Sequence, residues 1–115
     1  MAVPSVLPDD IQKRAAPRER TLRAGKLFVG PDLLEINCTV TDISDGGARL
    51  RLPPGQYIPD EVWLMEVRSG IVSRAKVAWR GYPLIGLRFV TSDHVDELSG
   101  ADGRIFKRIW STCRM

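Results

Sequence analysis

The sequence has few of the residues on which most catalytic and metal sites depend. Histidine occurs once, at His94, and the two cysteines, Cys38 and Cys113, lie far apart in the chain. A disulfide framework or a zinc site needs more such ligands at closer spacing, so we interpret both cysteines as small buried hydrophobic residues. Ser44 has no neighbouring histidine or lysine that would activate it as a nucleophile. We therefore expect no metal, no cofactor, no catalytic residues and no enzymatic activity.

Long apolar runs are also lacking, since none approaches the roughly 20 residues that span a bilayer. The first ten residues contain no basic side chain, unlike a secretory signal. We expect a soluble cytoplasmic protein with no membrane partner. The formal charge of +3 is too small to indicate nucleic acid by itself, and few aromatic side chains are left over to stack on bases. An oligonucleotide-binding barrel is thus a weaker alternative.

The sequence does contain a series of short segments in which apolar and polar residues alternate, enough for a single domain. The 115 residues fit a single domain. Residues 1–12 are punctuated by proline and lack periodicity, which predicts a flexible N-terminal arm before a domain over residues 13–115. From Leu34 to Val40 apolar and polar residues alternate strictly, as in a strand with one buried face. Similar segments cover residues 21–29, 48–52, 62–67, 74–80 and 85–90.

Six short strands with short connections predict an all-β fold, a six-stranded antiparallel β-barrel. Trp79 has the same parity as Ala75 and Val77, so we expect it in the core. Near the end of the sequence, apolar residues recur at the spacing that places them on one face of a helix: Ile105, Phe106, Ile109, Trp110 and Cys113. This stripe predicts a C-terminal α-helix that packs on the barrel or on a second subunit, which leaves a homodimer open.

Two clusters are candidates for binding. Arg14 and Arg18 lie four residues apart, with Arg20 just after them. A guanidinium group can grip a phosphate with two parallel hydrogen bonds and can stack on a base. The alternative is a solvated basic arm.

The second cluster is the segment from Asp42 to Gly47, which has the composition of a hairpin turn. Its functional interpretation uses the same residues. Asp42 would accept hydrogen bonds from the edge of a guanine, and the Ser44 hydroxyl would add another. Gly47 has no Cβ, so a flat ligand could approach the backbone there.

Together, R-x-x-x-R at residues 14–18 and D-x-S-x-x-G at residues 42–47 resemble the PilZ domain family. Ile-Gly-Leu-Arg-Phe at residues 85–89 is similar to the closing barrel strand of that family, so the resemblance covers roughly residues 13–90. It implies a bacterial receptor for the second messenger cyclic di-GMP. Arg14 and Arg18 would hold phosphates and stack on guanine, while Asp42, Ser44 and Gly47 would read the guanine edge.

The resemblance also implies a mechanism, in which ordering of the arm presents a new surface to a downstream protein partner. Family members of this kind influence motility, biofilm polysaccharide or virulence. Arg20, Arg80 and Arg88 are additional candidates for ligand contact, although for Arg80 and Arg88 we favour the interpretation as ordinary solvated strand arginines. Lys13 departs from the common pattern of consecutive arginines, which leaves the number of bound ligands open. The chief alternative is a PilZ-like interaction module that does not bind cyclic di-GMP.

Overall fold

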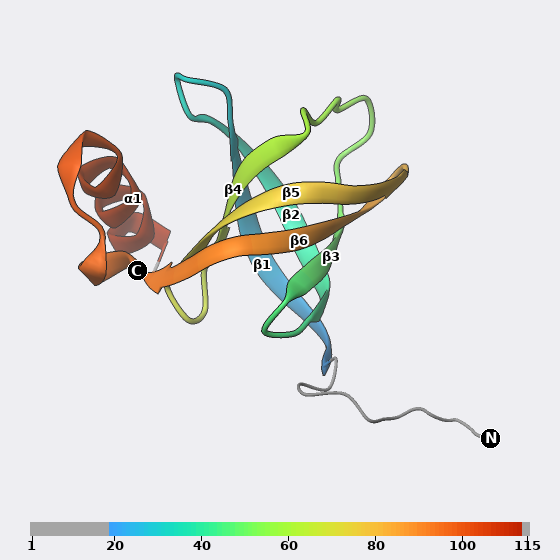
Figure 1. Ribbon diagram of the computed structural model, residues 1–115, viewed down its shortest axis with the longest axis horizontal. Coiled ribbons are helices and arrows are strands. Elements are labelled where there is room, and N and C mark those ends of the chain that lie inside the picture. The colour runs from blue at the N-terminus through green and yellow to red at the C-terminus, as the bar shows by residue number, and fades with distance from the viewer. Residues whose placement is uncertain (1–18, 114–115) are drawn as a thin grey trace.

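The computed structural model describes residues 19–113, with side chains from Leu22 onward, and shows a closed barrel followed by a helix (Figure 1). All strand pairs are antiparallel, and the order around the barrel is β1-β2-β3-β6-β5-β4, closed by the pairing of β4 with β1. The strands are β1 (Glu19–Val29), β2 (Leu34–Ile43), β3 (Gly47–Arg51), β4 (Glu61–Glu66), β5 (Ile71–Gly81) and β6 (Leu84–His94). The predicted six-stranded barrel is confirmed.

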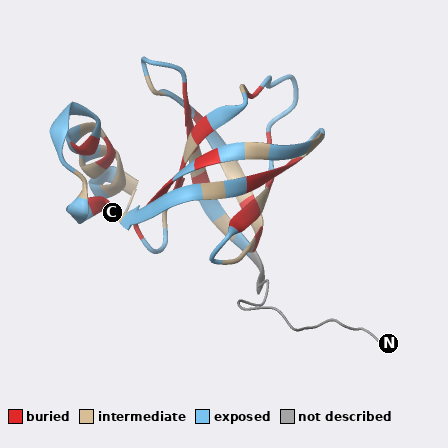
Figure 2. Ribbon diagram, viewed as in Figure 1, coloured by how far each residue is buried: buried red, intermediate tan, exposed pale blue. Residues whose placement is uncertain are grey.

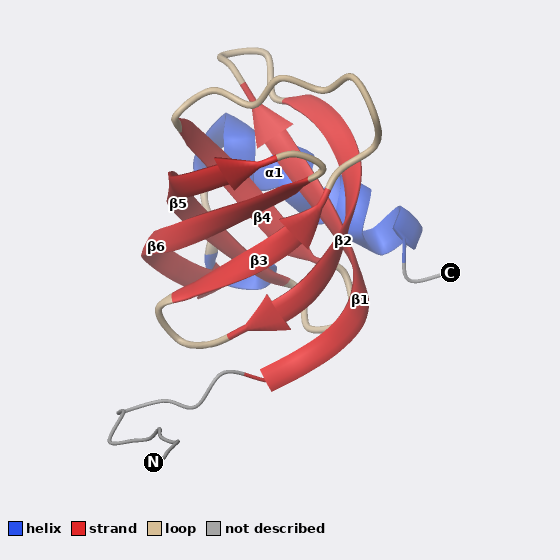
Figure 3. Ribbon diagram, turned by 90° about the vertical axis from the view of Figure 1, so that its right-hand side faces the viewer, coloured by secondary structure: helices blue, strands red, loops and turns tan. Residues whose placement is uncertain are grey.

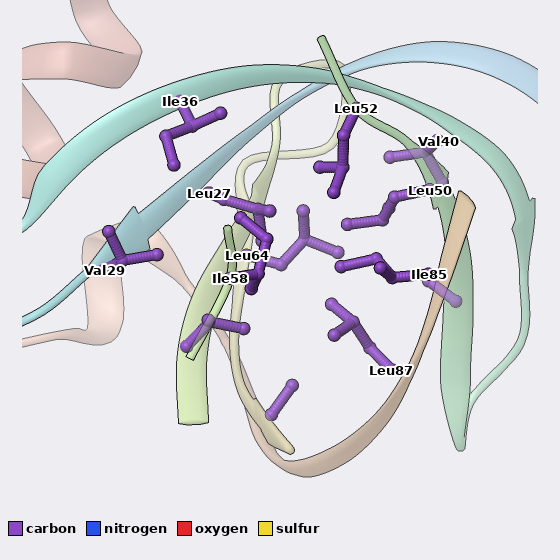
Figure 4. Close-up of a cluster of buried hydrophobic side chains, with 13 residues drawn as sticks. Leu27, Val29, Ile36, Val40, Leu50, Leu52, Ile58, Leu64, Ile85 and Leu87 are labelled. Atoms are coloured by element: carbon purple, nitrogen blue, oxygen red, sulfur yellow. The ribbon is translucent and has the colours of Figure 1, made fainter. Parts of the chain in front are cut away.

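The alternating residues of the strands fill the barrel interior. Ile36 and Val40 of β2, Leu50 of β3 and Ile85 of β6 belong to one buried cluster, drawn in Figure 4. Leu50 and Ile85 are register partners and both are fully buried. Because side chains on a strand alternate between faces, the intervening residues point outward. The outer wall of the barrel is therefore available for a site.

The predicted core position of Trp79 is wrong, because β5 contains a β-bulge. Val77 pairs with Leu87, whereas Trp79 pairs with the adjacent Gly86, so Ala78 is an extra residue. A bulge shifts the parity of the strand, and the Trp79 side chain is on the outside, 45% exposed. Its indole covers Gly86, where a Cβ atom would lie 2.0 Å from the indole Nε1.

The helix α1 (Gly100–Cys113) follows a short 3-10 turn, η1 (Val95–Glu97), and lies against one end of the barrel (Figures 1 and 2). Its Phe106 ring packs against Phe28, with ring centres 5.0 Å apart. The Trp110 Nε1–H donates to the Val67 carbonyl at 2.8 Å. Thus the apolar stripe packs on the chain's own barrel, the first of the two predicted alternatives. No helix within residues 19–113 is long and apolar enough to cross a membrane.

Candidate functional site

The D-x-S-x-x-G motif forms the end of β2 and the hairpin that leads into β3. Asp42 lies next to a bulge in β2, and β3 begins at Gly47. The hairpin is closed by backbone and side-chain hydrogen bonds. The Ser44 N–H donates to the Gly47 carbonyl at 2.9 Å, and the Gly46 N–H donates to Ser44 Oγ at 3.3 Å. Ser44 therefore has a structural role in the turn, whatever else it contacts.

Asp42 is the unusual member of the motif, because it is a charged residue with only 3% of its surface exposed. Its Oδ2 lies 3.2 Å from Arg49 Nη2, across the β2–β3 ladder. Its Oδ1 is buried and has no hydrogen-bond partner in the part of the chain that the structure describes. A buried acceptor without a partner costs free energy and calls for an explanation. Asp42 Oδ1 is therefore an acceptor in need of a donor.

Gly47 is required by the barrel itself. A Cβ atom at this position would lie 2.1 Å from the Leu87 carbonyl oxygen in β6, far inside van der Waals contact. The backbones of β3 and β6 approach each other too closely here for any side chain. This packing explains the glycine without a ligand, which differs from the sequence-based explanation that the missing Cβ makes room for a flat ligand.

The predicted arm residues Arg14 and Arg18, like the whole of residues 1–12, lie outside the described residues. The strand that follows the arm is informative, however. β1 begins at Glu19, whose register partner is Ile43, and the next pair joins Arg20 with Asp42. The first described residues of β1 therefore lie beside the D-x-S-x-x-G hairpin, at the same edge of the barrel (Figures 1 and 3).

The three additional arginines are placed differently. Arg20 pairs with Asp42 through its backbone, and its side chain is not described. Arg88 is exposed on β6, directly opposite Gly47. Arg80 is near the opposite end of the barrel, in an ion pair with Asp60 at 2.6 Å. Arg88 is thus next to the hairpin, whereas Arg80 is committed to other contacts.

Three residues that the sequence analysis did not assign to the site, Arg49, Gly86 and Trp79, complete a row across five strands. Successive register partners run from Arg20 in β1 through Asp42, Arg49 and Gly86 to Trp79 in β5. Cross-strand partners share a face of the sheet. The row therefore places a carboxylate, a guanidinium and a flat indole on one face of the sheet, with Asp42 buried and Trp79 exposed. Trp79 belongs to this row only because of the bulge in β5. The alternating pattern of the sequence does not reveal that bulge.

Arg49 is held firmly in this row. Its Nε–H donates to Thr41 Oγ1 at 3.1 Å, while its Nη2 contacts Asp42. Thr41 Oγ1 in turn donates to the Arg49 carbonyl at 3.1 Å. These contacts fix both the guanidinium and the carboxylate before any ligand arrives, which is the preorganisation that binding sites need.

Residues 19–113 contain no group of three His, Cys, Asp or Glu side chains that could hold a metal ion. The single histidine caps η1, where His94 Nδ1 accepts from the Asp96 N–H at 3.1 Å. The expectation of few exposed aromatic residues was wrong, since Tyr57, Trp79 and Tyr82 are all substantially exposed.

Comparison with known proteins places this site in a family context. A family model described as "PilZ domain" matches residues 12–100. A solved structure of Bacillus subtilis Inhibitor of motility (MotI/DgrA) is similar with a TM-score of 0.55 and 16% sequence identity. The match covers 95% of this chain but 56% of that chain, so our chain spans little more than half of that protein's length. At this identity the likeness shows the fold alone. A comparison with curated proteins gave no match.

Proposed function

Because the chain belongs to the PilZ domain family, whose model matches residues 12–100, we propose that it is a receptor for cyclic di-GMP. PilZ domains are binding modules. In this proposal the arm that carries Arg14 and Arg18 and the hairpin from Asp42 to Gly47 bind the dinucleotide together. The observation that carries the proposal is the buried Asp42 Oδ1, which has no partner among the described residues and lies beside the start of β1.

Asp42 is suited to the edge of a guanine. The Watson–Crick edge of guanine presents two kinds of donor, a ring N–H and an amino group. A carboxylate has two oxygens that can accept from them. One Asp42 oxygen is held by Arg49 and the other has no partner among residues 19–113. A guanine N–H would satisfy the second oxygen. Ligand binding would then remove a cost that the unliganded protein carries.

The two purines and two phosphates of cyclic di-GMP match the other residues of the proposed site. Arg14 and Arg18 would grip phosphates, which accept bidentate hydrogen bonds from guanidinium groups. Trp79, exposed above Gly86, offers a face for base stacking, worth about 1–3 kcal/mol per base. Arg49 acts as a positioning residue, since it orients the Asp42 carboxylate. Arg88, opposite Gly47, is close enough to the hairpin to add a cation.

The energies are sufficient for useful affinity. Micromolar binding requires about 8 kcal/mol, and a charge-assisted hydrogen bond contributes roughly 1.5–3 kcal/mol. Four or five such contacts, with stacking, reach that value and offset about 2–5 kcal/mol for ordering the arm. Ordering of the arm would also change the surface beside the hairpin. We propose that a downstream protein in the cytoplasm binds this changed surface. Regulation of motility or biofilm formation is the output that we propose.

One observation favours a second candidate, a PilZ-type interaction module without ligand. Ser44 and Gly47 each have a structural role in the hairpin, and Arg49 already pairs with Asp42. Calorimetric titration with cyclic di-GMP separates the two candidates. We expect saturable heat for the wild-type chain and a strongly reduced affinity for Arg18→Ala. Absence of heat from the wild-type chain at high protein concentration would establish the second candidate.

A further inference from the structure

A concave surface lies beyond the end of β3 that is farther from the hairpin. The β3–β4 loop and the turn between β5 and β6 enclose a hollow of about 610 Å³. Its walls are mainly three prolines and two tyrosines: Pro53, Pro54, Pro83, Tyr57 and Tyr82. Tyr57 is 74% exposed and Tyr82 is 47% exposed, so the aromatic rings face solvent. The volume falls within the range of small-ligand sites, about 300–1,000 Å³.

Arg80 holds this groove in shape. Its Nη1 donates to the Ile58 carbonyl and, at 3.1 Å, to Tyr82 Oη. Its guanidinium lies 5.4 Å from the centre of the Tyr57 ring, a cation–π contact. The ion pair with Asp60 anchors the other side of the guanidinium. One arginine thus ties the loop and both tyrosines together, so little ordering is required when the groove is filled.

One polar atom in the wall, the Tyr82 hydroxyl, is left as a hydrogen-bond donor. Tyr82 Oη accepts from the Ile58 N–H at 3.3 Å and from Arg80. A hydroxyl oxygen has two acceptor lone pairs and one proton, so both lone pairs are engaged and the O–H is left to donate. The groove therefore fits an apolar chain with carbonyl acceptors and few N–H groups. A proline-containing segment in the extended polyproline conformation has those properties.

We propose that residues 3–8 of this same chain, Val-Pro-Ser-Val-Leu-Pro, dock in the groove. The segment has two prolines, three aliphatic residues and no charged residue, which matches the apolar walls. Aromatic-lined grooves are a recurring means of recognising proline-containing segments, because proline already restricts the backbone. The segment precedes the residues that the structure describes, and the docking does not depend on cyclic di-GMP.

The length of the connecting chain agrees with this placement. Glu19 and Ala48 are both register partners of Ile43, so they are separated by two strand spacings, about 10 Å. From Ala48 to Pro53 the chain advances about 17 Å at ~3.3 Å per residue, which puts the groove about 20 Å from Glu19. The connecting residues 9–18 have a root-mean-square length of about 17 Å as a flexible chain.

Tethering makes even a weak contact effective. The effective concentration of a tethered segment is greatest when the length of its linker matches the span, and it reaches roughly millimolar values. A groove with only a millimolar intrinsic affinity would then be occupied for about half of the time. No partner protein is required.

Photo-crosslinking of the full chain tests the proposal. We would place the photoreactive residue p-benzoylphenylalanine at position 5 (Ser5→p-benzoylphenylalanine), irradiate, and map the products by mass spectrometry. We expect crosslinks within one chain to residues 53–57 and 82–83. Tyr57→Ala should lower their yield about threefold, because a roughly fivefold loss of affinity, the equivalent of one lost aromatic contact, takes the occupancy from about one-half to about one-sixth. Leu34→Ala, which removes another exposed apolar side chain (63% exposed, against 74% for Tyr57) elsewhere, should leave the yield unchanged.

Three results would overturn the proposal: crosslinks that map to another surface, covalent dimers in place of products within one chain, or a yield that Tyr57→Ala does not change. Thermal unfolding of Tyr57→Ala serves as the check on folding, since an exposed side chain should hardly affect the midpoint. A free peptide of residues 1–12, added in excess, should compete with the tethered segment and lower the yield.

Discussion

Asp42 and Arg49 face each other across β2 and β3, with Asp42 Oδ2 at 3.2 Å from Arg49 Nη2. The pair leaves the other carboxylate oxygen buried and without a partner among residues 19–113. If this buried ion pair served only to stabilise the barrel, both carboxylate oxygens would be expected to have hydrogen-bond partners. The half-satisfied carboxylate instead fits an acceptor held ready for an incoming donor.

Asp42→Asn should weaken binding of cyclic di-GMP without unfolding the protein. The amide keeps the size of the carboxylate but loses its charge and places an N–H₂ group where guanine N–H donors arrive. Loss of one charge-assisted contact costs about 1.5–3 kcal/mol, so we expect the Kd to rise roughly 10- to 150-fold. The matched control is Asp45→Asn, an exposed aspartate in the same hairpin. Equal Kd values for the two variants in calorimetry would contradict this role of Asp42.

Trp79 should report ligand binding by fluorescence. If a guanine stacks on its exposed indole, addition of cyclic di-GMP quenches the emission of the wild-type chain. The quenching should disappear in Trp79→Phe, because Trp63 and Trp110 both pack against the cluster of Phe28 and Phe106, where α1 meets the barrel. Phenylalanine keeps a stacking face, so the Kd should change less than in Trp79→Ala, for which we expect a loss of about 1–3 kcal/mol. Quenching that persists in Trp79→Phe would place the ligand elsewhere.

Gly47→Ala should destabilise the barrel in the absence of any ligand. The new methyl group would lie 2.1 Å from the Leu87 carbonyl oxygen, so the backbones of β3 and β6 must separate. Overpacking of this kind costs about 1–3 kcal/mol. Gly46→Ala is the control, since a Cβ atom there would meet nothing within 4 Å. Urea unfolding that gives both variants the same free energy would show that Gly47 is not required by packing.

Cys38 should resist alkylation in the folded protein. Burial raises the pKa of its thiol from 9.0 to about 12, opposed in smaller part by Lys26. Only the thiolate reacts, so iodoacetamide at pH 8 should modify Cys38 in denaturant and spare it in the native state. The same shift means that the folded state holds the proton more tightly, so this group's contribution to stability falls as the pH rises above 9.0. Mass spectrometry showing equal labelling in both states would refute this.

The sequence predicts the barrel well because its evidence is local. Alternation such as that of Leu34–Val40 follows directly from the two-residue period of a strand, and the apolar stripe of Phe106 and Trp110 follows from the period of a helix. The motif segments could also be recognised from the order and spacing of their residues. That β1 begins beside the D-x-S-x-x-G hairpin follows from the pairing of Glu19 with Ile43, which no local pattern specifies.

What could not be predicted depends on irregularities and on contacts between strands. A single extra residue, Ala78, reverses the face on which Trp79 lies. The reason for Gly47 is the carbonyl of Leu87, forty residues away in the chain. The ion pair that leaves half of the Asp42 carboxylate unsatisfied likewise requires knowledge of which residue stands opposite.

The most direct test of the central claim is a crystal structure of the full chain with cyclic di-GMP. The account predicts a guanine N–H within about 3 Å of Asp42 Oδ1, with Arg14 and Arg18 on phosphates of the same ligand. A ligand bound away from the hairpin, or an Asp42 Oδ1 that stays without a ligand donor in the complex, would contradict it.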